Sequence, residues 1–334
     1  MTAPALVAHA DWSVHPQKRW MAAAKLRAGG YLADAPAPVG PLDGFWARLA
    51  AAAGEDGPIL VGFDFPIGLP AAYAKRAGIG DFLEALDGFD ERFYDVAAAA
   101  EEISLARPFY PRRPGGRTRR HLLDALELET WDLLHRRCDR RTRHRPAACP
   151  MFWTLGGNQV GRAALNGWRH LLAPARQDGI DVAIWPFDGA LGDLLDSHRF
   201  VVAETYPGEV YGHLDLALRA HGGKRRRTAR AASATRMLDW AERSAIALAP
   251  GLAAEIEDGF GPNPGGDDRF DAVVGLFGML NVLSGARPSG EPADPVVQRI
   301  EGWILGLDAA ETAPDDPRAA GAQPGGDNRH RGVL

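Results

Sequence analysis

Residues 59–70 read ILVGFDFPIGLP. The run opens with consecutive apolar side chains, which is typical of a strand buried on both faces in the middle of a parallel sheet. Gly57 and Pro58 come before the run and Pro66 follows it, so we expect the strand to end near Asp64. A carboxylate directly after a buried strand lies at the edge of the sheet where α/β proteins bind their ligands.

Three more strands are expected before this stretch. Residues 6–11 have the pattern of a buried strand, and residues 19–26 and 30–34 have that of shorter antiparallel partners joined by polar or glycine-containing turns. Residues 42–53 carry apolar side chains at helical spacing. The order of elements is therefore strand, strand, strand, helix, strand.

The pattern changes after residue 70. Residues 71–198 contain helical stretches at 91–106, 119–141 and 158–175, separated by breaks rich in proline and glycine. We interpret this part as a large helical insertion between the fourth and fifth strands. Residues 199–306 then rejoin residues 1–70 to complete the core, with a fifth strand at 200–204 and helices near 229–247 and 269–284. Residues 307–334 lack apolar periodicity and are expected to be a disordered tail.

Composition restricts the class of protein. The chain has 334 residues, a formal charge of −5 and two cysteines. This charge argues against a protein whose whole surface binds nucleic acid, although a local basic patch remains compatible with it. The spacing of Cys138 and Cys149 indicates reduced, structural thiols. The N-terminus has neither a signal peptide nor a membrane-spanning stretch, so we expect a cytoplasmic protein without membrane contact.

Acidic residues recur where the strands are expected to end. Asp11, Asp64 and Glu204 each end or directly follow an apolar run, and Asp268 and Asp271 lie in the first turn of the last expected helix. If the three strands are parallel neighbours, these carboxylates meet at one crevice. Crowded carboxylates raise one another's pKa, so a cation is needed to neutralise them. We expect Mg²⁺ or Mn²⁺, which take oxygen ligands and assist phosphoryl displacement.

Each acid also has a simpler structural interpretation. Asp11 is suited to capping a turn. Asp64 lies shortly before a proline and is suited to an Asx turn, and Asp268 is suited to an N-cap. Glu204 is suited to an ion pair with an arginine. The joint placement at three strand ends and one helix start favours the metal-binding interpretation over these alternatives.

Four segments carry a resemblance to a known family. They are ADWS at 10–13, VGFDFPIGLP at 61–70, VVAETYPGEVYGHL at 201–214 and DDRFDAVVGLFGML at 267–280. Together they resemble the predicted RNase H-like nucleases known as domain of unknown function 429, over roughly residues 1–70 and 199–284. The order of elements is also similar to the ribonuclease H fold. The resemblance implies an α/β, ribonuclease H-like mixed sheet of five strands, and metal-dependent cleavage carried by Asp11, Asp64, Glu204 and Asp271.

Basic and amide side chains supply candidate contacts to a substrate. Residues 107–145 contain twelve arginines, which would bind phosphates or, alternatively, form a solvated helix face with acidic partners. A second basic run at 224–227 suits either a phosphate contact or a surface loop. The amides of a GGNQ segment are placed at a helix start, where they would hydrogen-bond a base or sugar. The candidate substrate-binding residues are Asn158, Gln159, Arg112, Arg113, Lys224 and Arg225.

These features favour a metal-dependent nuclease or phosphodiesterase that hydrolyses nucleic acid. Two alternatives remain open. One keeps the metal site and assigns it a small phosphorylated substrate, because the insertion is large enough to roof the crevice. The other is a non-catalytic module that binds nucleic acid through the arginines.

Overall fold

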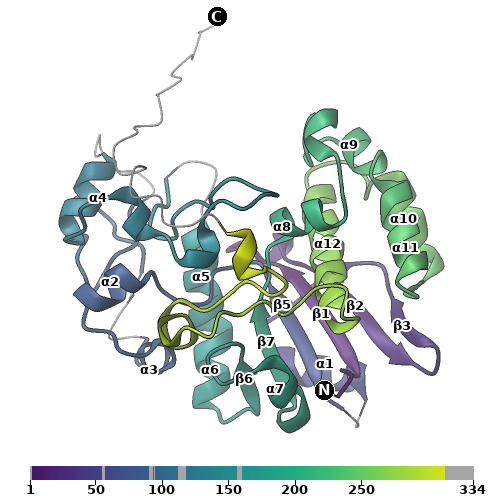
Figure 1. Ribbon diagram of the computed structural model, residues 1–334, viewed down its shortest axis with the longest axis horizontal. Coiled ribbons are helices and arrows are strands. Elements are labelled where there is room, and N and C mark those ends of the chain that lie inside the picture. Colours follow the sequence, from purple (N-terminus) through teal and green to yellow (C-terminus); the bar gives the residue numbers. More distant parts are fainter. Residues whose placement is uncertain are drawn as a thin grey trace, which may run out of the picture.

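The computed structural model describes residues 2–54, 57–89, 93, 95–111, 118–155 and 160–312 (Figure 1). Its strands form a mixed sheet in the order β6-β7-β5-β1-β2-β3-β8, and β4 pairs with β2 outside this path. The strands are β1 (Leu6–Asp11), β2 (Trp20–Arg27), β3 (Gly30–Ala33), β4 (Ala37–Pro38), β5 (Ile59–Phe63), β6 (Val182–Ile184), β7 (Phe200–Glu204) and β8 (Ala247–Leu248).

The centre of the sheet has the expected arrangement. The strand β2 is antiparallel to both β1 and β3. The strands β1, β5 and β7 are parallel neighbours, so their carboxyl ends lie at one edge. The predicted number of five strands is wrong, because the described residues form a sheet of eight. The strands that the sequence did not reveal are two or three residues long, too short for any periodicity to show.

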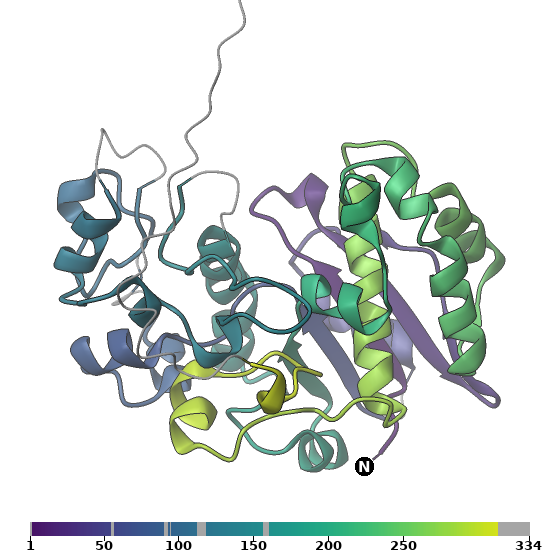
Figure 2. The ribbon, with the colours of Figure 1, turned by 45° about the horizontal axis from the view of Figure 1, so that its top comes forward.

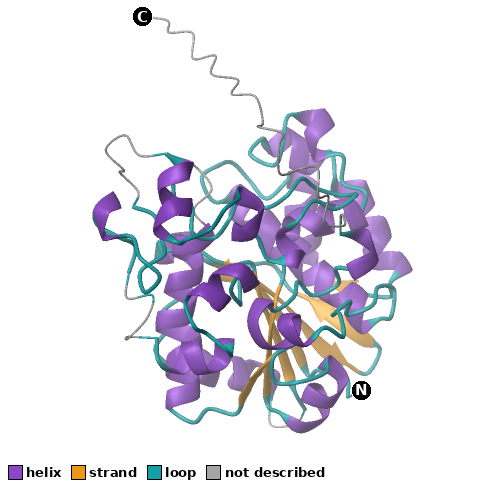
Figure 3. Cartoon of the chain, turned by 60° about the vertical axis from the view of Figure 1, so that its left-hand side comes forward, coloured by secondary structure: helices purple, strands orange, loops and turns teal. Residues whose placement is uncertain are grey.

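Helices cover both faces of the sheet (Figures 1 and 3). The helices are α1 (Phe45–Ala53), α2 (Ala71–Arg76), α3 (Phe82–Asp87), α4 (Arg119–Ala125), α5 (Val160–Gly167), α6 (Ala173–Gln177), α7 (Leu191–Ser197), α8 (Pro207–His213), α9 (Arg227–Ala231), α10 (Ala234–Arg243), α11 (Pro250–Asp258) and α12 (Gly266–Leu283). A π-helical turn at Trp168–Leu172 joins α5 to α6. Among the described residues, the model contains no helix that is both long and apolar enough to span a bilayer.

The sheet separates two hydrophobic cores. One includes Ala8 and Phe63 together with buried residues of α1, α5 and α6, and the other includes Val7 and Leu60 together with those of α8, α10 and α12. Successive side chains of a strand point to opposite faces. The face that each strand residue occupies can therefore be read from the core to which it belongs.

The helix α12 packs directly on β1 and β2, as Figure 2 shows. Gly275 permits this close approach, because a Cβ atom there would lie 2.1 Å from the ring of His9. The expected helix at 269–284 is therefore confirmed, and α1 confirms the one at 42–53. Both helices cover the sheet with long apolar faces, which is the pattern that sequence periodicity detects best.

The helices expected in residues 71–198 are only partly present. The stretch 119–141 is α-helical only to Ala125, because Glu127 takes up a left-handed conformation with φ 55°, and its later helical parts are 3₁₀ turns at Trp131–Leu134 and Arg137–Asp139. Within 91–106, the described residues form only a 3₁₀ turn at Ala100–Glu102. The stretch 158–175 is helical from residue 160 onward. This part of the chain also contributes β6 to the main sheet.

Candidate functional site

Asp11 and Asp64 lie on the same face of the sheet. The register pairs His9 with Gly62 and Ala10 with Phe63. Asp11 and Asp64 continue the His9–Gly62 row by the alternation of the strands, so both point toward α12. The backbone amide of Trp12 donates a hydrogen bond of 2.6 Å to Oδ1 of Asp64.

Asp271 reaches the same place from the second turn of α12. Its carboxylate is buried, and its two oxygens are contacted by the hydroxyl of Tyr211 and the ammonium of Lys224. Tyr211 comes from α8, and Lys224 from the loop before α9. Asp11, Asp64, Asp271 and Lys224 interact electrostatically with one another. We call these four residues the acidic centre.

The acidic centre carries less positive than negative charge. Burial, followed by the negative charges of Asp64 and Asp271, raises the pKa of Asp11 well above its usual range. Burial likewise raises the pKa of Asp64 to about 6, although the Trp12 amide opposes the rise. Burial alone would lower the pKa of Lys224, but the carboxylates, with Asp271 first, raise it. One ammonium thus stands among three carboxylates, an arrangement that a divalent cation would stabilise.

Asp268 lies one turn before Asp271 on α12 and is only partly buried. Burial raises its pKa, and the charges of Asp267 and Asp271 add to the rise. Asp268 is therefore at the rim of the acidic centre, within the electrostatic reach of Lys224.

Glu204 does not join the acidic centre. The register pairs it with Phe63 rather than with Asp64, so its side chain lies on the opposite face of the sheet. Both of its oxygens are 2.6 Å from guanidinium nitrogens of Arg136, and Oε2 also accepts a hydrogen bond of 2.7 Å from the amide of Ile67. The expected cluster of four carboxylates is thus divided into three on one face and Glu204 on the other. Its contacts therefore match the alternative interpretation, in which Glu204 forms an ion pair with an arginine.

Arg136 also neutralises the other ionisable groups around Glu204. Its guanidinium pairs with Asp139 at 2.9 Å and is completely buried. Cys138, Asp139 and Glu204 offer ligand atoms close to one another, but the guanidinium already supplies the positive charge there. Cys138 and Cys149 are both free thiols.

The structure describes only two of the six candidate substrate-binding residues. Lys224 belongs to the acidic centre, and the exposed Arg225 is its neighbour in the chain. Arg112, Arg113, Asn158 and Gln159 lie outside the described residues. Several of the remaining arginines in 107–145 form ion pairs within the protein. Arg136 lies 2.6 Å from Glu204, and Arg145 lies 2.8 Å from Glu209.

A cavity of about 240 Å³ lies between Val14 and the helical residues 162–170. Its lining is Val14, Asp95, Val96, Arg162, Leu165, Asn166, Arg169 and His170. The side-chain oxygen of Asn166 accepts hydrogen bonds from Nε1 of Trp12, at 3.1 Å, and from Arg19, at 2.8 Å. Sequence reasoning placed Asn166 on a helix, but it contained no signal for which polar residue of that helix would meet the end of β1.

The chain matches no protein-family model, no curated protein and no solved structure. The chemistry of the site therefore has to be inferred from the side chains themselves.

Proposed function

We propose that this chain is a metal-dependent phosphodiesterase of ribonuclease H-like architecture that cleaves nucleic acid with Mg²⁺ or Mn²⁺. The observation that carries the proposal is the convergence of Asp11, Asp64 and Asp271 from two parallel strand ends and a helix. The ribonuclease H-like assignment is supported by the contiguous order β3-β2-β1-β5-β7, in which only β2 runs antiparallel to its neighbours.

The donors of the acidic centre fit a hard cation. All three ligand side chains are carboxylates, and Mg²⁺ and Mn²⁺ prefer oxygen ligands. Burial and the neighbouring carboxylates raise the pKa of Asp11, and burial raises that of Asp64, so a cation would stabilise the ionised form of both acids. When bound there, the ion would supply an activated water and neutralise charge on the phosphate.

The other residues of the site would position these groups. The Trp12 amide fixes the orientation of Asp64, and Tyr211 fixes that of Asp271. Lys224 holds a positive charge beside the carboxylates, where it would contact a phosphate oxygen.

The test is cleavage of mixed single- and double-stranded DNA and RNA oligonucleotides in Mg²⁺ or Mn²⁺. We expect Asp64→Asn to lower the rate about a hundredfold or more, because removal of a metal-binding carboxylate costs several kcal/mol of transition-state stabilisation. Asp215→Asn is the matched control, since Asp215 pairs with Arg236 outside the acidic centre and is exposed. Thermal unfolding of both variants checks that they fold. The proposal fails if the unaltered protein cleaves nothing, or if Asp64→Asn cleaves at the same rate.

A second candidate keeps the carboxylates of the acidic centre and assigns them a small phosphorylated substrate. Turnover of bis-p-nitrophenyl phosphate and of mononucleotides, with no cleavage of oligonucleotides, would favour this candidate. Salt-sensitive oligonucleotide binding without turnover of any substrate would favour a binding module instead.

A further inference from the structure

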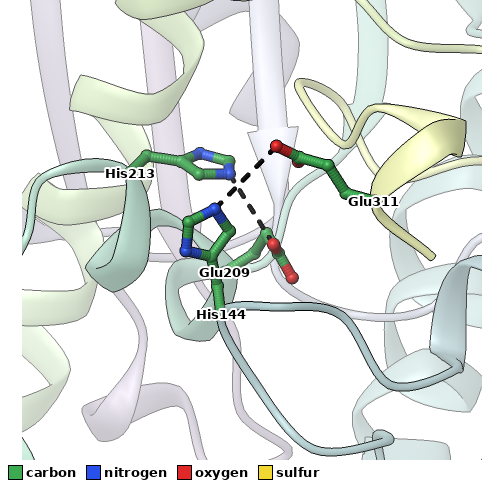
Figure 4. Close-up of side chains that lie close together, drawn as sticks. All are labelled: His144, Glu209, His213 and Glu311. Carbon is green, nitrogen blue, oxygen red and sulfur yellow. Dashed lines mark ion pairs between the residues drawn. The ribbon is translucent and has the colours of Figure 1, made fainter. Parts of the chain in front are cut away.

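A second group of metal-ligand side chains lies outside the acidic centre. Glu209 and His213 project from α8 at positions i and i+4, His144 comes from the loop that follows Arg137–Asp139, and Glu311 from a 3₁₀ turn at Ala309–Glu311 (Figure 4). One ligand atom from each residue lies within 4.8 Å of the others. These four side chains are called the histidine–glutamate cluster below.

The cluster contains a buried nitrogen that makes no hydrogen bond, although it lies in ion-pair range of Glu209. Nε2 of His213 has no hydrogen-bond partner among the described residues, although its side chain is only 4% exposed. It lies 3.7 Å from Oε1 of Glu209, beyond hydrogen-bond range. Buried polar nitrogens are almost always satisfied, so this atom points to an additional ligand in the space that Figure 4 shows between the four side chains.

His144, the second histidine of the cluster, has an unprotonated Nε2, which is the form of the nitrogen that binds a metal. Nε2 of His144 accepts a hydrogen bond of 2.9 Å from Nε of Arg143, so this nitrogen carries a lone pair rather than a proton. The same nitrogen lies 3.9 Å from Oε1 of Glu311. Four tetrahedral ligands at zinc distances are about 3.3 Å apart, so small side-chain rotations would close the cluster around an ion.

Surrounding contacts hold the ligands in place. Oγ1 of Thr142 contacts both oxygens of Glu209, at 3.1 and 3.0 Å, and Arg145 pairs with the same carboxylate at 2.8 Å. The ring of His144 packs against Gly212, where a Cβ atom would lie 2.3 Å from its Nδ1. Glu311 is held by Arg287. Such outer contacts orient ligands in known metal sites.

We propose that His144, Glu209, His213 and Glu311 bind one zinc-like divalent cation. Two imidazoles and two carboxylates are zinc ligands, and four protein ligands leave no open position for a water, as in a structural rather than a catalytic zinc site. The ion would tie three separate parts of the chain together: the loop at 140–145, α8 and the last described turn. Because α8 also carries Tyr211, this tie would steady a residue that contacts Asp271.

Three guanidiniums already pair with the carboxylates of the cluster: Arg145 with Glu209, and Arg143 and Arg287 with Glu311. Arg143 is the most exposed of them, so it is the one that an ion would displace most easily. Its guanidinium pairs with Glu311 and donates to His144, and its side chain is 63% exposed. The proposal therefore makes an unusual prediction, namely that Arg143→Gln strengthens zinc binding. An ordinary ion-pair cluster without a metal would only lose contacts in that variant.

The experiment uses the full chain, stripped with a chelator and titrated with zinc and with cobalt. We expect one equivalent of zinc, a zinc-dependent rise in the melting temperature, and the visible absorption of tetrahedral cobalt. His144→Gln should weaken binding about tenfold or more, and Arg143→Gln should tighten it. Glu311→Gln provides a second ligand variant in case His144→Gln fails to fold. The exposed His221→Gln is the matched control.

Asp64→Asn separates this site from the acidic centre, because zinc binding should persist in that variant. The proposal is overturned if the chain takes up no zinc, if His144→Gln and Glu311→Gln bind it as well as the unaltered protein does, or if Asp64→Asn abolishes binding. It is also overturned if Arg143→Gln binds zinc more weakly than the unaltered protein.

Discussion

His9 is a charge-sensitive residue beneath the acidic centre. It is fully buried in β1, and its Nδ1 lies 2.9 Å from the carbonyl oxygen of Ala272 in α12. Burial lowers its pKa to about 4, although the hydrogen bond to Ala272 opposes the shift. At neutral pH the ring is therefore uncharged and donates to the carbonyl. Protonation of His9 would place a positive charge in the packed layer between β1 and α12, where Gly275 allows no space to relax.

The effect of His9 on stability depends on pH. The unfolded chain binds a proton at His9 near pH 6.5, whereas the folded chain does so only near pH 4. Since the unfolded state binds more protons in this range, the stabilisation is complete above pH 6.5 and is lost as the pH falls toward 4. We expect His9→Gln to remove a change of about 3 kcal/mol in the free energy of unfolding over this range.

The measurement is urea unfolding of the unaltered protein and of His9→Gln at a series of pH values. The difference in the free energy of unfolding between the two proteins isolates the effect of His9. Asp64, whose pKa is raised to about 6, changes the stability of both proteins with pH in the opposite direction. Protonated Asp64 favours the folded state, so its contribution is present in acid and is lost as the pH rises toward 6. Identical pH dependence in the two proteins would show that His9 does not titrate as its burial requires.

At the scale of elements, the sequence predicted which strands are neighbours but not which face each acid occupies. The apolar runs before Asp11, Asp64 and Glu204 predicted three buried strands, and the assumption that these strands are parallel neighbours is confirmed. Face depends on register, and the β5–β7 register aligns Phe63 with Glu204. Register is set by tertiary packing and by Arg136, which is far away in the chain, so no local pattern could reveal it.

The arginine-rich stretch was mispredicted for a related reason. Its residues have helical spacing and acidic neighbours, but the α-helix ends at Ala125. A 3₁₀ turn follows at Trp131–Leu134, and Arg136 itself has an extended backbone. In place of a continued helix, the buried Arg136 contacts Glu204 and Asp139. Tertiary contacts of this kind routinely override helix propensity. The signal for Glu209 and His213, an acid and a histidine at i and i+4, was present in the sequence.

Arg136 gives a test of the division of the acids. Removing it leaves Glu204 and Asp139 buried without their partner, so Arg136→Met should destabilise the fold by about 3–5 kcal/mol. Glu204→Gln combined with Arg136→Met should recover part of the loss, because one of the two unpaired charges is removed. Urea unfolding measures both effects. A loss below about 1 kcal/mol in Arg136→Met would contradict the burial of this ion pair.

Glu204→Gln also distinguishes the two faces of the sheet. Since Glu204 points away from the acidic centre, Mn²⁺ binding at Asp11 and Asp64 should change less than about twofold in Glu204→Gln, but should be lost in Asp64→Asn. Calorimetric titration with Mn²⁺ provides the comparison. A matched loss in both variants would mean that Glu204 shares the ion after all.

At the scale of the whole molecule, many arginines form ion pairs within the protein rather than a basic surface. The net charge is −5, and many arginines of residues 107–145 are paired with acids from distant segments, as Arg137 is with Asp294 at 2.7 Å. These pairs join the segment 290–312 and α8 to the loops that precede α5. In Figures 1 and 2 the C-terminal segment, drawn in yellow, runs between the helices of residues 71–177 and the sheet. Much of the positive charge is thus used to join these parts.

This use of charge sets the expected salt dependence of nucleic-acid binding. Each phosphate neutralised by a lysine or arginine adds about one to the slope of log affinity against log salt. With Arg136 and Arg145 buried, we expect a slope of about 2 or 3 in magnitude, supplied by groups such as Lys224 and Arg225. Fluorescence anisotropy with a labelled single-stranded oligonucleotide in Ca²⁺ measures it, and Lys224→Gln with Arg225→Gln should reduce the slope further. A slope of about 8 or more would instead require a broad basic surface, which the internal pairing of these arginines disfavours.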